Sequence, residues 1–230
     1  MIKISLLHAS RQRPQIAFDC FNEWVQNASS PEQVQYILGL DDDDPTINEY
    51  IELFARPSEE YKLIMNFTDS RNVVQAFNNA AKLISSTTEL IITVSDDMGC
   101  FKNWDIELFK LLEGVNNFEE PRFIGVSDGV RAYGIVLVYY IANVAYYKKF
   151  GYILYPEYDG VFADNDMHQV ARKSSYLINA PQLIFQHKHW SLGLSKKDKI
   201  SIKNDAITNP TGWKRNYEIY KARIKRNFDL

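Results

Sequence analysis

The sequence has few of the residues that mark disulfide-built, membrane-spanning or low-complexity proteins. Its 230 residues include two cysteines, ten glycines and eight prolines, and Cys20 and Cys100 lie far apart in no metal-binding spacing. The longest apolar stretch, residues 135–147, is interrupted by Asn143, and it is shorter than the roughly 18 to 20 residues that span a bilayer. Without a secretory leader, the expected setting is a reduced cytoplasm.

Several chemical signatures are also missing from the sequence. It contains no glycine-rich phosphate loop, no zinc-ligand spacing and no Gly-x-Ser-x-Gly nucleophile motif. What it has is a hydrophobic content of 46% and an aromatic content of 13%, enough to bury a large core. The net charge is −3, although residues 196–226 carry ten Lys and Arg against three acids. This basic end alone is weak support for a nucleic-acid partner, and none is expected.

The first hundred residues alternate short apolar runs with segments of helical period, which is typical of a parallel sheet covered by helices. We expect strands and helices to alternate at residues 2–7, 14–27, 34–40, 49–54, 61–67, 71–86 and 89–94. Asp69 or Ser70 is expected to cap the helix over residues 71–86. The predicted fold class is α/β, with a mainly parallel central sheet, flanking helices and a C-terminal helical extension. Ligands of such sheets bind beyond the carboxyl ends of the strands.

The second half has a different pattern and predicts an acceptor-binding half in the same domain. The expected elements are helices at 104–112 and 164–172, strands at 122–126 and 181–186, and a strand that gives way to a helix over 134–150. We therefore predict one domain over residues 1–195, with a nucleotide-binding half (1–100) and an acceptor half (101–195). Residues 196–230 are predicted to form a basic connector and a C-terminal helix.

The C-terminal helix is predicted to be amphipathic over residues 213–228. Its aromatic stripe consists of Trp213, Tyr217, Tyr220 and Ile224, at spacings of three and four. Two interpretations stay open: the stripe packs onto the domain or a second subunit, or the helix makes peripheral contact with an anionic membrane.

Two adjacent carboxylates, Asp96 and Asp97, follow the apolar strand at 89–94. Such a pair can form a turn or cap, or it can bind a divalent cation that holds a phosphorylated ligand. The metal interpretation gains weight because other polar groups follow neighbouring strands. They are Ser10, Arg11 and Arg13 after the first strand, the acids 41–44 after the second, and Arg71 after the third.

The order of elements and the placement of these acids over residues 1–190 resemble the GT-A fold glycosyltransferases, in particular the large inverting family that includes many bacterial sugar transferases. The resemblance implies that Ser10, Arg11 and Arg13 lie beside the base or ribose, and that Asp41 or Asp42 receives the uracil edge. It also implies that Asp97 ligates the metal and Asp96 lies near the ribose. Ser95 stands where the family's motif has its first acid.

The same resemblance extends to the second half. The pair Asn165-Asp166 matches the family's Glu-Asp pair, which implies that Asp166 is the catalytic base, with Asp164 as the second candidate. His187 matches the family's C-terminal metal ligand, and His189 is the alternative. Imidazole and carboxylate ligands suit Mn²⁺, whereas Mg²⁺ prefers oxygen.

The expected function is metal-dependent transfer, with inversion, of a sugar from a nucleotide-sugar donor to a hydroxyl of a glycan or another acceptor. UDP-sugars are the expected donors, and Mn²⁺ or Mg²⁺ is the expected cofactor. Two alternatives remain: a sugar nucleotidyltransferase, and a non-catalytic glycan- or nucleotide-binding module.

Overall fold

A computed structural model describes residues 1–113, 118–188, 193–194, 198, 202 and 210–230. A seven-stranded sheet runs through the molecule in the order β3-β2-β1-β4-β6-β5-β7. Its strands are β1 (Ile4–Ser10), β2 (Val34–Asp41), β3 (Lys62–Thr68), β4 (Leu90–Ser95), β5 (Phe123–Ser127), β6 (Ile141–Asn143) and β7 (Leu177–Ile184). The first four are mutually parallel, and the antiparallel strand β6 joins them to the parallel pair β5 and β7. The predicted α/β fold with a mainly parallel sheet is therefore confirmed.

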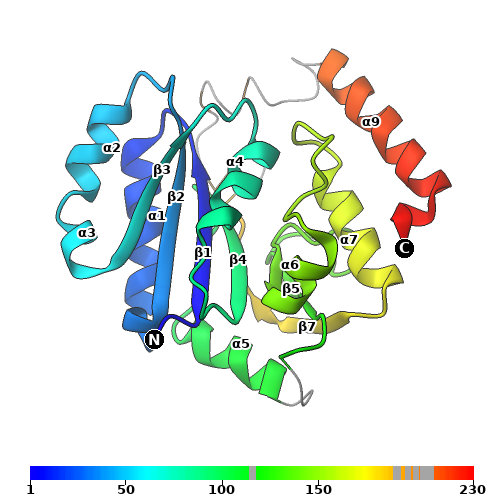
Figure 1. Cartoon of the computed structure of the whole chain (residues 1–230), viewed down its shortest axis with the longest axis horizontal. Coiled ribbons are helices and arrows are strands. Elements are labelled where there is room, and N and C mark those ends of the chain that lie inside the picture. Colours follow the sequence, from blue (N-terminus) through cyan, green and yellow to red (C-terminus); the bar gives the residue numbers. More distant parts are fainter. Residues whose placement is uncertain (114–117, 189–192, 195–197, 199–201, 203–209) are drawn as a thin grey trace.

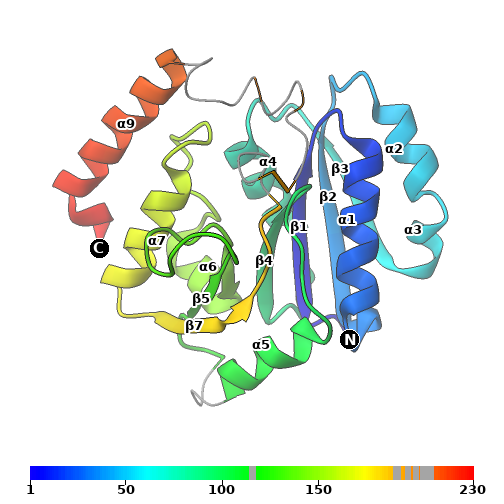
Figure 2. The ribbon, with the colours of Figure 1, turned by 180° about the vertical axis from the view of Figure 1, so that it is seen from behind.

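Helices cover both faces of this sheet. In Figure 1 α4 lies in front of the strands, and the reverse view in Figure 2 brings α1 to the front. The helices are α1 (Pro14–Asn27), α2 (Ile47–Phe54), α3 (Pro57–Glu60), α4 (Val73–Ala80), α5 (Trp104–Glu113), α6 (Val144–Phe150), α7 (Ala163–Lys173) and α9 (Pro210–Lys225). Short 3-10 turns at Pro31–Gln33, Ala81–Leu83 and Asn227–Asp229 complete the described elements. Helix α9 runs beside α7, on the side of the molecule away from α2 and α3 (Figure 1).

Two hydrophobic cores lie on opposite faces of the sheet because side chains alternate along each strand. Leu6 of β1 packs with Trp24 of α1 in one core, whereas the neighbouring Leu7 packs with Phe77 of α4 in the other. Helix α1 suits its place, since Pro14 occupies the first turn and Phe21, Trp24 and the other buried positions recur at helical spacing. The cores thus fix the strands whose ends carry the polar groups.

The helix predicted over residues 71–86 is shorter and capped differently. Helix α4 begins at Val73, and its N-cap is Asn72, whose side chain accepts a hydrogen bond of 2.9 Å from the Gln75 N–H. The prediction of Asp69 or Ser70 as the cap was wrong, because the Ser70 hydroxyl is instead bonded to Thr68 and Asn79. Asp69 forms an exposed ion pair with Arg71.

Other differences affect boundaries. The short helix α3 was not predicted, and β7 begins four residues before the strand expected at 181–186. The predicted division at residue 195 lies outside the described residues. None of the described helices is both long and apolar enough to cross a membrane.

Candidate functional site

The polar groups predicted to form the site follow strands that end at one edge of the sheet. Strands β1, β2 and β4 are parallel and in register, so Ser10, Asp41 and Ser95 all lie at their carboxyl ends. This edge is uppermost in Figure 1. Asp41 and Asp97 therefore share one edge, as the sequence predicted.

Arg13, just after β1, lies between two carboxylates. Its Nε and Nη2 atoms each donate to Asp198 over 2.6 Å, and Nη1 lies 3.5 Å from the Asp96 Oδ2 atom. A planar guanidinium suits such a two-point contact with a carboxylate or phosphate. Asp198 was not predicted, because it lies about a hundred residues from Asp96 in a polar stretch without periodic pattern. Arg13 and Asp96 are thus brought together as expected.

Asp96 is also tied to a buried histidine that the sequence analysis missed. The His8 Nε2 atom lies 2.9 Å from Asp96 Oδ1, and His8 Nδ1 contacts the Tyr36 hydroxyl. His8 has no exposed surface, so these contacts satisfy both ring nitrogens in the interior. A histidine inside an otherwise apolar strand was the available signal.

Arg11 pairs with the acids that follow β2. Its Nη1 atom donates to Asp41 over 2.6 Å and also contacts Asp43. Burial raises the pKa of Asp41, and the hydrogen bond and charge of Arg11 oppose this shift. The ion pair of Arg11 with Asp41 thereby joins the carboxyl ends of β1 and β2.

The remaining predicted donor residues differ in environment. The Ser10 hydroxyl is buried and lies 2.7 Å from the Tyr50 hydroxyl. Asp42 is exposed, and its backbone N–H donates to the Thr68 carbonyl. Arg71 is largely exposed and pairs with Asp69 at 3.5 Å; within the described part of the chain it contacts none of the other predicted donor residues.

Asp97 and His187, two of the predicted metal ligands, lie next to each other. The His187 Nε2 atom lies 3.2 Å from Asp97 Oδ2, and the backbone fixes the pair because Met98 and His187 form an antiparallel bridge. The Lys188 N–H also donates to the Asp97 carbonyl over 2.7 Å. His189 lies outside the described residues.

The chemistry of this pair suits a divalent cation in part. One carboxylate and one imidazole converge, and both side chains keep some exposure to solvent. They are ligand types for Mn²⁺. The described residues contain no group of three His, Cys, Asp or Glu side chains placed to hold a metal.

Asp164 lies in the first turn of α7 and interacts electrostatically with His187. Burial raises the pKa of the Asp164 carboxyl, while the Asn165 N–H, the charge of Arg131 and the interaction with His187 oppose the shift. Arg131 itself is held by Asp128, which follows β5 and lies 2.6 Å away. A carboxylate whose pKa is raised by burial is a candidate for a general base. Arg131 and Asp128 were not predicted, although a Ser-Asp-Gly turn after a strand is a signal for them.

Asp166 occupies a different environment although it is only two residues further along. It is 1% exposed and forms a two-point contact with Arg223, at 2.8 Å and 3.2 Å. The Tyr158 hydroxyl also donates to it over 3.2 Å. Burial raises the pKa of Asp166, and Arg223 opposes that shift. Its predicted role as base is not tested by this geometry and stays a prediction.

A groove at the opposite edge of the sheet is separate from this site. It is lined by residues at the amino ends of β1 and β4, such as Lys3 and Glu89, and by Phe109 of α5. No residue predicted for the site lines it.

Comparison with solved structures shows that the fold of this chain is similar to that of several glycosyltransferases. The chain is similar to TarS of S. aureus, with a TM-score of 0.63 and 11% identity over 80% of this chain and 36% of that one. It is also similar to the mannosyltransferase PcManGT from Pyrobaculum calidifontis, with a TM-score of 0.61 and 8% identity over 82% of this chain and 59% of that one. The catalytic domain of Drosophila beta1,4galactosyltransferase 7 gives a TM-score of 0.55 and 14% identity over 86% of this chain and 75% of that one.

These likenesses establish the fold and leave the activity open. The chain spans between about a third and two thirds of the length of the TarS structures that it matches. No family model matches the sequence. A search of curated proteins also finds no match.

Proposed function

We propose that this chain is a metal-dependent, inverting glycosyltransferase that moves a sugar from a nucleotide-sugar, preferably a UDP-sugar, to a hydroxyl of a glycan or another acceptor. The observation that carries the proposal is the 3.2 Å contact of Asp97 with His187 at the carboxyl edge of the sheet, together with the electrostatic interaction of His187 with Asp164. Structures of TarS contain UDP or UDP-GlcNAc, and the PcManGT structure contains GDP-Man and Mn²⁺. The Drosophila enzyme is described with xylobiose.

Each residue has a proposed role. Arg11, Arg13 and Asp96 bind the nucleotide, with Ser10 and Asp41 beside them. Asp97 and His187 hold Mn²⁺ or Mg²⁺, which when bound supplies positive charge to the leaving diphosphate.

We assign the base to Asp164 in preference to Asp166. Asp164 is partly exposed, so an acceptor hydroxyl can approach it and give up its proton. Asp166 already shares its two oxygens with Arg223 and Tyr158. A single displacement with Asp164 as base inverts the configuration at the anomeric carbon.

The test combines binding with turnover. UDP with Mn²⁺ should raise the melting temperature of the protein, because a ligand that binds only the folded state stabilises it by mass action. Asp97→Asn should remove most of the Mn²⁺-dependent part of UDP affinity in calorimetry, whereas Asp69→Asn, an exposed acid of the ion pair with Arg71, should leave it unchanged. Unchanged UDP affinity in Asp97→Asn would remove Asp97 from the metal site.

Turnover separates the proposal from its alternatives. A glycosyltransferase releases UDP from a UDP-sugar when an acceptor is present, and NMR of the product gives the anomeric configuration. Release of pyrophosphate from a nucleoside triphosphate and a sugar phosphate would indicate a nucleotidyltransferase. Binding of nucleotides without any turnover would indicate a binding module.

A further inference from the structure

Helix α9 places an arginine in the interior of the molecule. Arg223 is 1% exposed, and its Nε and Nη2 atoms contact the two carboxylate oxygens of Asp166 on α7. Arginine is rarely buried unless it is paired. The pair joins residues 57 positions apart, and it therefore connects the C-terminal helix directly to α7, whose first turn contains Asp164.

The connection is made at the first turn of α7. The Asp166 N–H donates to the Phe162 carbonyl over 2.9 Å, so Asp164 lies between two anchored residues. At one anchor, the Phe162 ring lies 5.2 Å from Trp213 and 5.5 Å from Tyr220 of α9. At the other, Asp166 is held by Arg223. Helix α9 thus contacts Phe162 and Asp166, the residues on either side of Asp164.

The backbone at Phe162 supports this interpretation. Phe162 has a φ of 68°, in the left-handed region, which is unusual for a bulky side chain. Such a conformation persists only where the surroundings impose it. The aromatic contacts with α9 supply that constraint and set the direction in which α7 begins.

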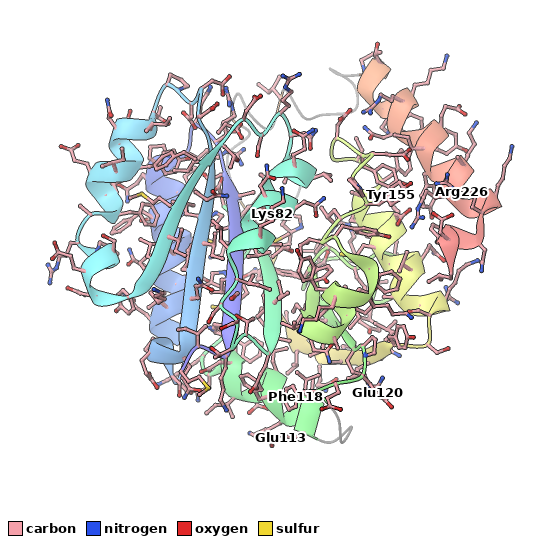
Figure 3. All side chains as sticks on the ribbon, viewed as in Figure 1. Lys82, Glu113, Phe118, Glu120, Tyr155 and Arg226 are labelled. Atoms are coloured by element: carbon pink, nitrogen blue, oxygen red, sulfur yellow. The ribbon has the colours of Figure 1, made fainter. Side chains whose placement is uncertain are left out.

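The guanidinium of Arg223 has a single well-defined orientation. It lies 4.0 Å from the centre of the Tyr155 ring, and Nη2 lies 3.4 Å from the Tyr152 hydroxyl. Arg226, the first residue after α9, donates to the Tyr155 hydroxyl over 3.1 Å, and Figure 3 shows Arg226 and Tyr155 near each other. Asp229 contacts the remaining nitrogen of Arg223. Because these contacts fix the guanidinium of Arg223, the guanidinium can in turn fix the position of the Asp166 carboxylate.

We infer that Arg223 is a positioning residue for the transfer reaction: through Asp166 it fixes the first turn of α7 and thereby the location of Asp164. This inference rests on the proposed function, in which Asp164 is the base. A base must lie within hydrogen-bond reach of its proton, and a shift of about 1 Å can lower a rate roughly 100-fold. Arg223 is expected to affect kcat and not nucleotide binding, because the nucleotide residues lie at the carboxyl ends of β1, β2 and β4.

The test compares two buried residues of the same helix. Arg223→Met should lower kcat roughly 10- to 100-fold with UDP affinity and donor KM changed less than about two-fold. Asn216 is the matched control: it is 1% exposed, and it docks α9 by accepting the Asp159 N–H over 3.0 Å. Asn216→Ala should lower the melting temperature and leave kcat within about two-fold of wild type below the melting transition. Arg223→Lys, which keeps the charge but cannot bind both carboxylate oxygens in the same planar geometry, should fall between wild type and Arg223→Met.

A double variant covers the case in which Arg223→Met does not fold. Asp166→Leu combined with Arg223→Met replaces the buried pair by apolar groups, a change that often preserves stability. This variant should fold and keep a lowered kcat, because apolar packing does not fix the direction of the turn as the two-point ion pair does. Wild-type kcat in either folded variant, or equal decreases in kcat in Arg223→Met and Asn216→Ala, would overturn the inference while wild-type transfer stands.

The measurements distinguish a failure of the proposed function from a failure of this inference. If wild-type protein binds UDP but transfers no sugar, the proposed function is wrong. Hydrogen exchange at residues 163–166 then still tests whether Arg223 fixes the turn. Faster exchange there in Arg223→Met, with wild-type exchange in Asn216→Ala, would support the structural part. Wild-type exchange in both variants would overturn it.

Discussion

Asp164 and Asp166 lie two residues apart on one helix but interact with different parts of the protein. Asp164 is in the range of His187 and Arg131, whereas Asp166 is enclosed by Arg223 and Tyr158. Spacing of two places side chains on different sides of a helix, so one residue can serve the site while the other serves the packing.

The first prediction separates these roles by amide substitution. Asp164→Asn keeps the size of the side chain but removes the proton acceptor, so transfer should fall roughly 10²- to 10⁴-fold with UDP affinity retained. Asp166→Asn should chiefly lower the stability, by about 3 kcal/mol, because it removes the buried counter-charge of Arg223 and leaves the half-exposed Asp229 as its ionic partner. UDP-release kinetics and urea unfolding measure the two effects. Full transfer by folded Asp164→Asn would return Asp166 to the role of base.

A second prediction concerns pH. Burial raises the pKa of Asp164 above the ordinary value of 3.8, and a base must be ionised to act. Transfer should therefore increase with pH as Asp164 loses its proton, and this acidic limb should lie above pH 3.8. The limb should be absent from the residual activity of Asp164→Asn. A profile of kcat/KM against pH for both proteins checks this, and an identical limb in the variant would assign it to another group.

At the scale of elements, the periodic segments were predicted well and the connections were not. Helix α1 has the predicted bounds because Pro14 and the apolar spacing of Phe21 and Trp24 determine it locally. The contacts of His8 with Asp96 and of Arg13 with Asp198 join residues far apart in the chain. No local pattern encodes such pairs, since the sheet order decides them.

The start of α4 gives a prediction at this scale. Asn72→Ala should destabilise the fold by about 1 kcal/mol, because the Gln75 N–H loses its side-chain acceptor. Asn72→Asp keeps an acceptor and should retain most of the stability. Asp69→Ala, at the position first expected to be the cap, should change stability by less than about 0.5 kcal/mol. Urea unfolding of the three variants provides the comparison, and equal destabilisation by Asn72→Ala and Asp69→Ala would contradict the assignment of the cap.

At the scale of the whole molecule, α9 connects the C-terminal end of the chain to α7 and to the segment before it. Its aromatic stripe was predicted to pack against the domain or to contact a membrane. In the structure Trp213, Tyr217 and Tyr220 gather around Phe162, although Ile224 of the same stripe is 48% exposed. The sequence pattern did not reveal that the most buried residues of the helix would be polar, namely Asn216 and Arg223. They are buried because Asp159 and Asp166 offer partners there.

Removing α9 tests both interpretations of this helix, packing against the domain and contact with a membrane. Deletion of residues 210–230 leaves Asp166 without Arg223 and uncovers the ring of Phe162. Loss of one partner of a buried ion pair costs about 3 to 5 kcal/mol, and at this chain length each kcal/mol lowers the melting temperature by about 2 to 4 °C. The truncated protein should therefore melt about 10 °C below the full chain in calorimetry. Full-length protein should not sediment with anionic vesicles at low salt. A truncated chain of unchanged stability, whose full-length parent does bind such vesicles, would mean that α9 serves the membrane instead of the fold, because the basic residues on its outer faces would then carry the interaction.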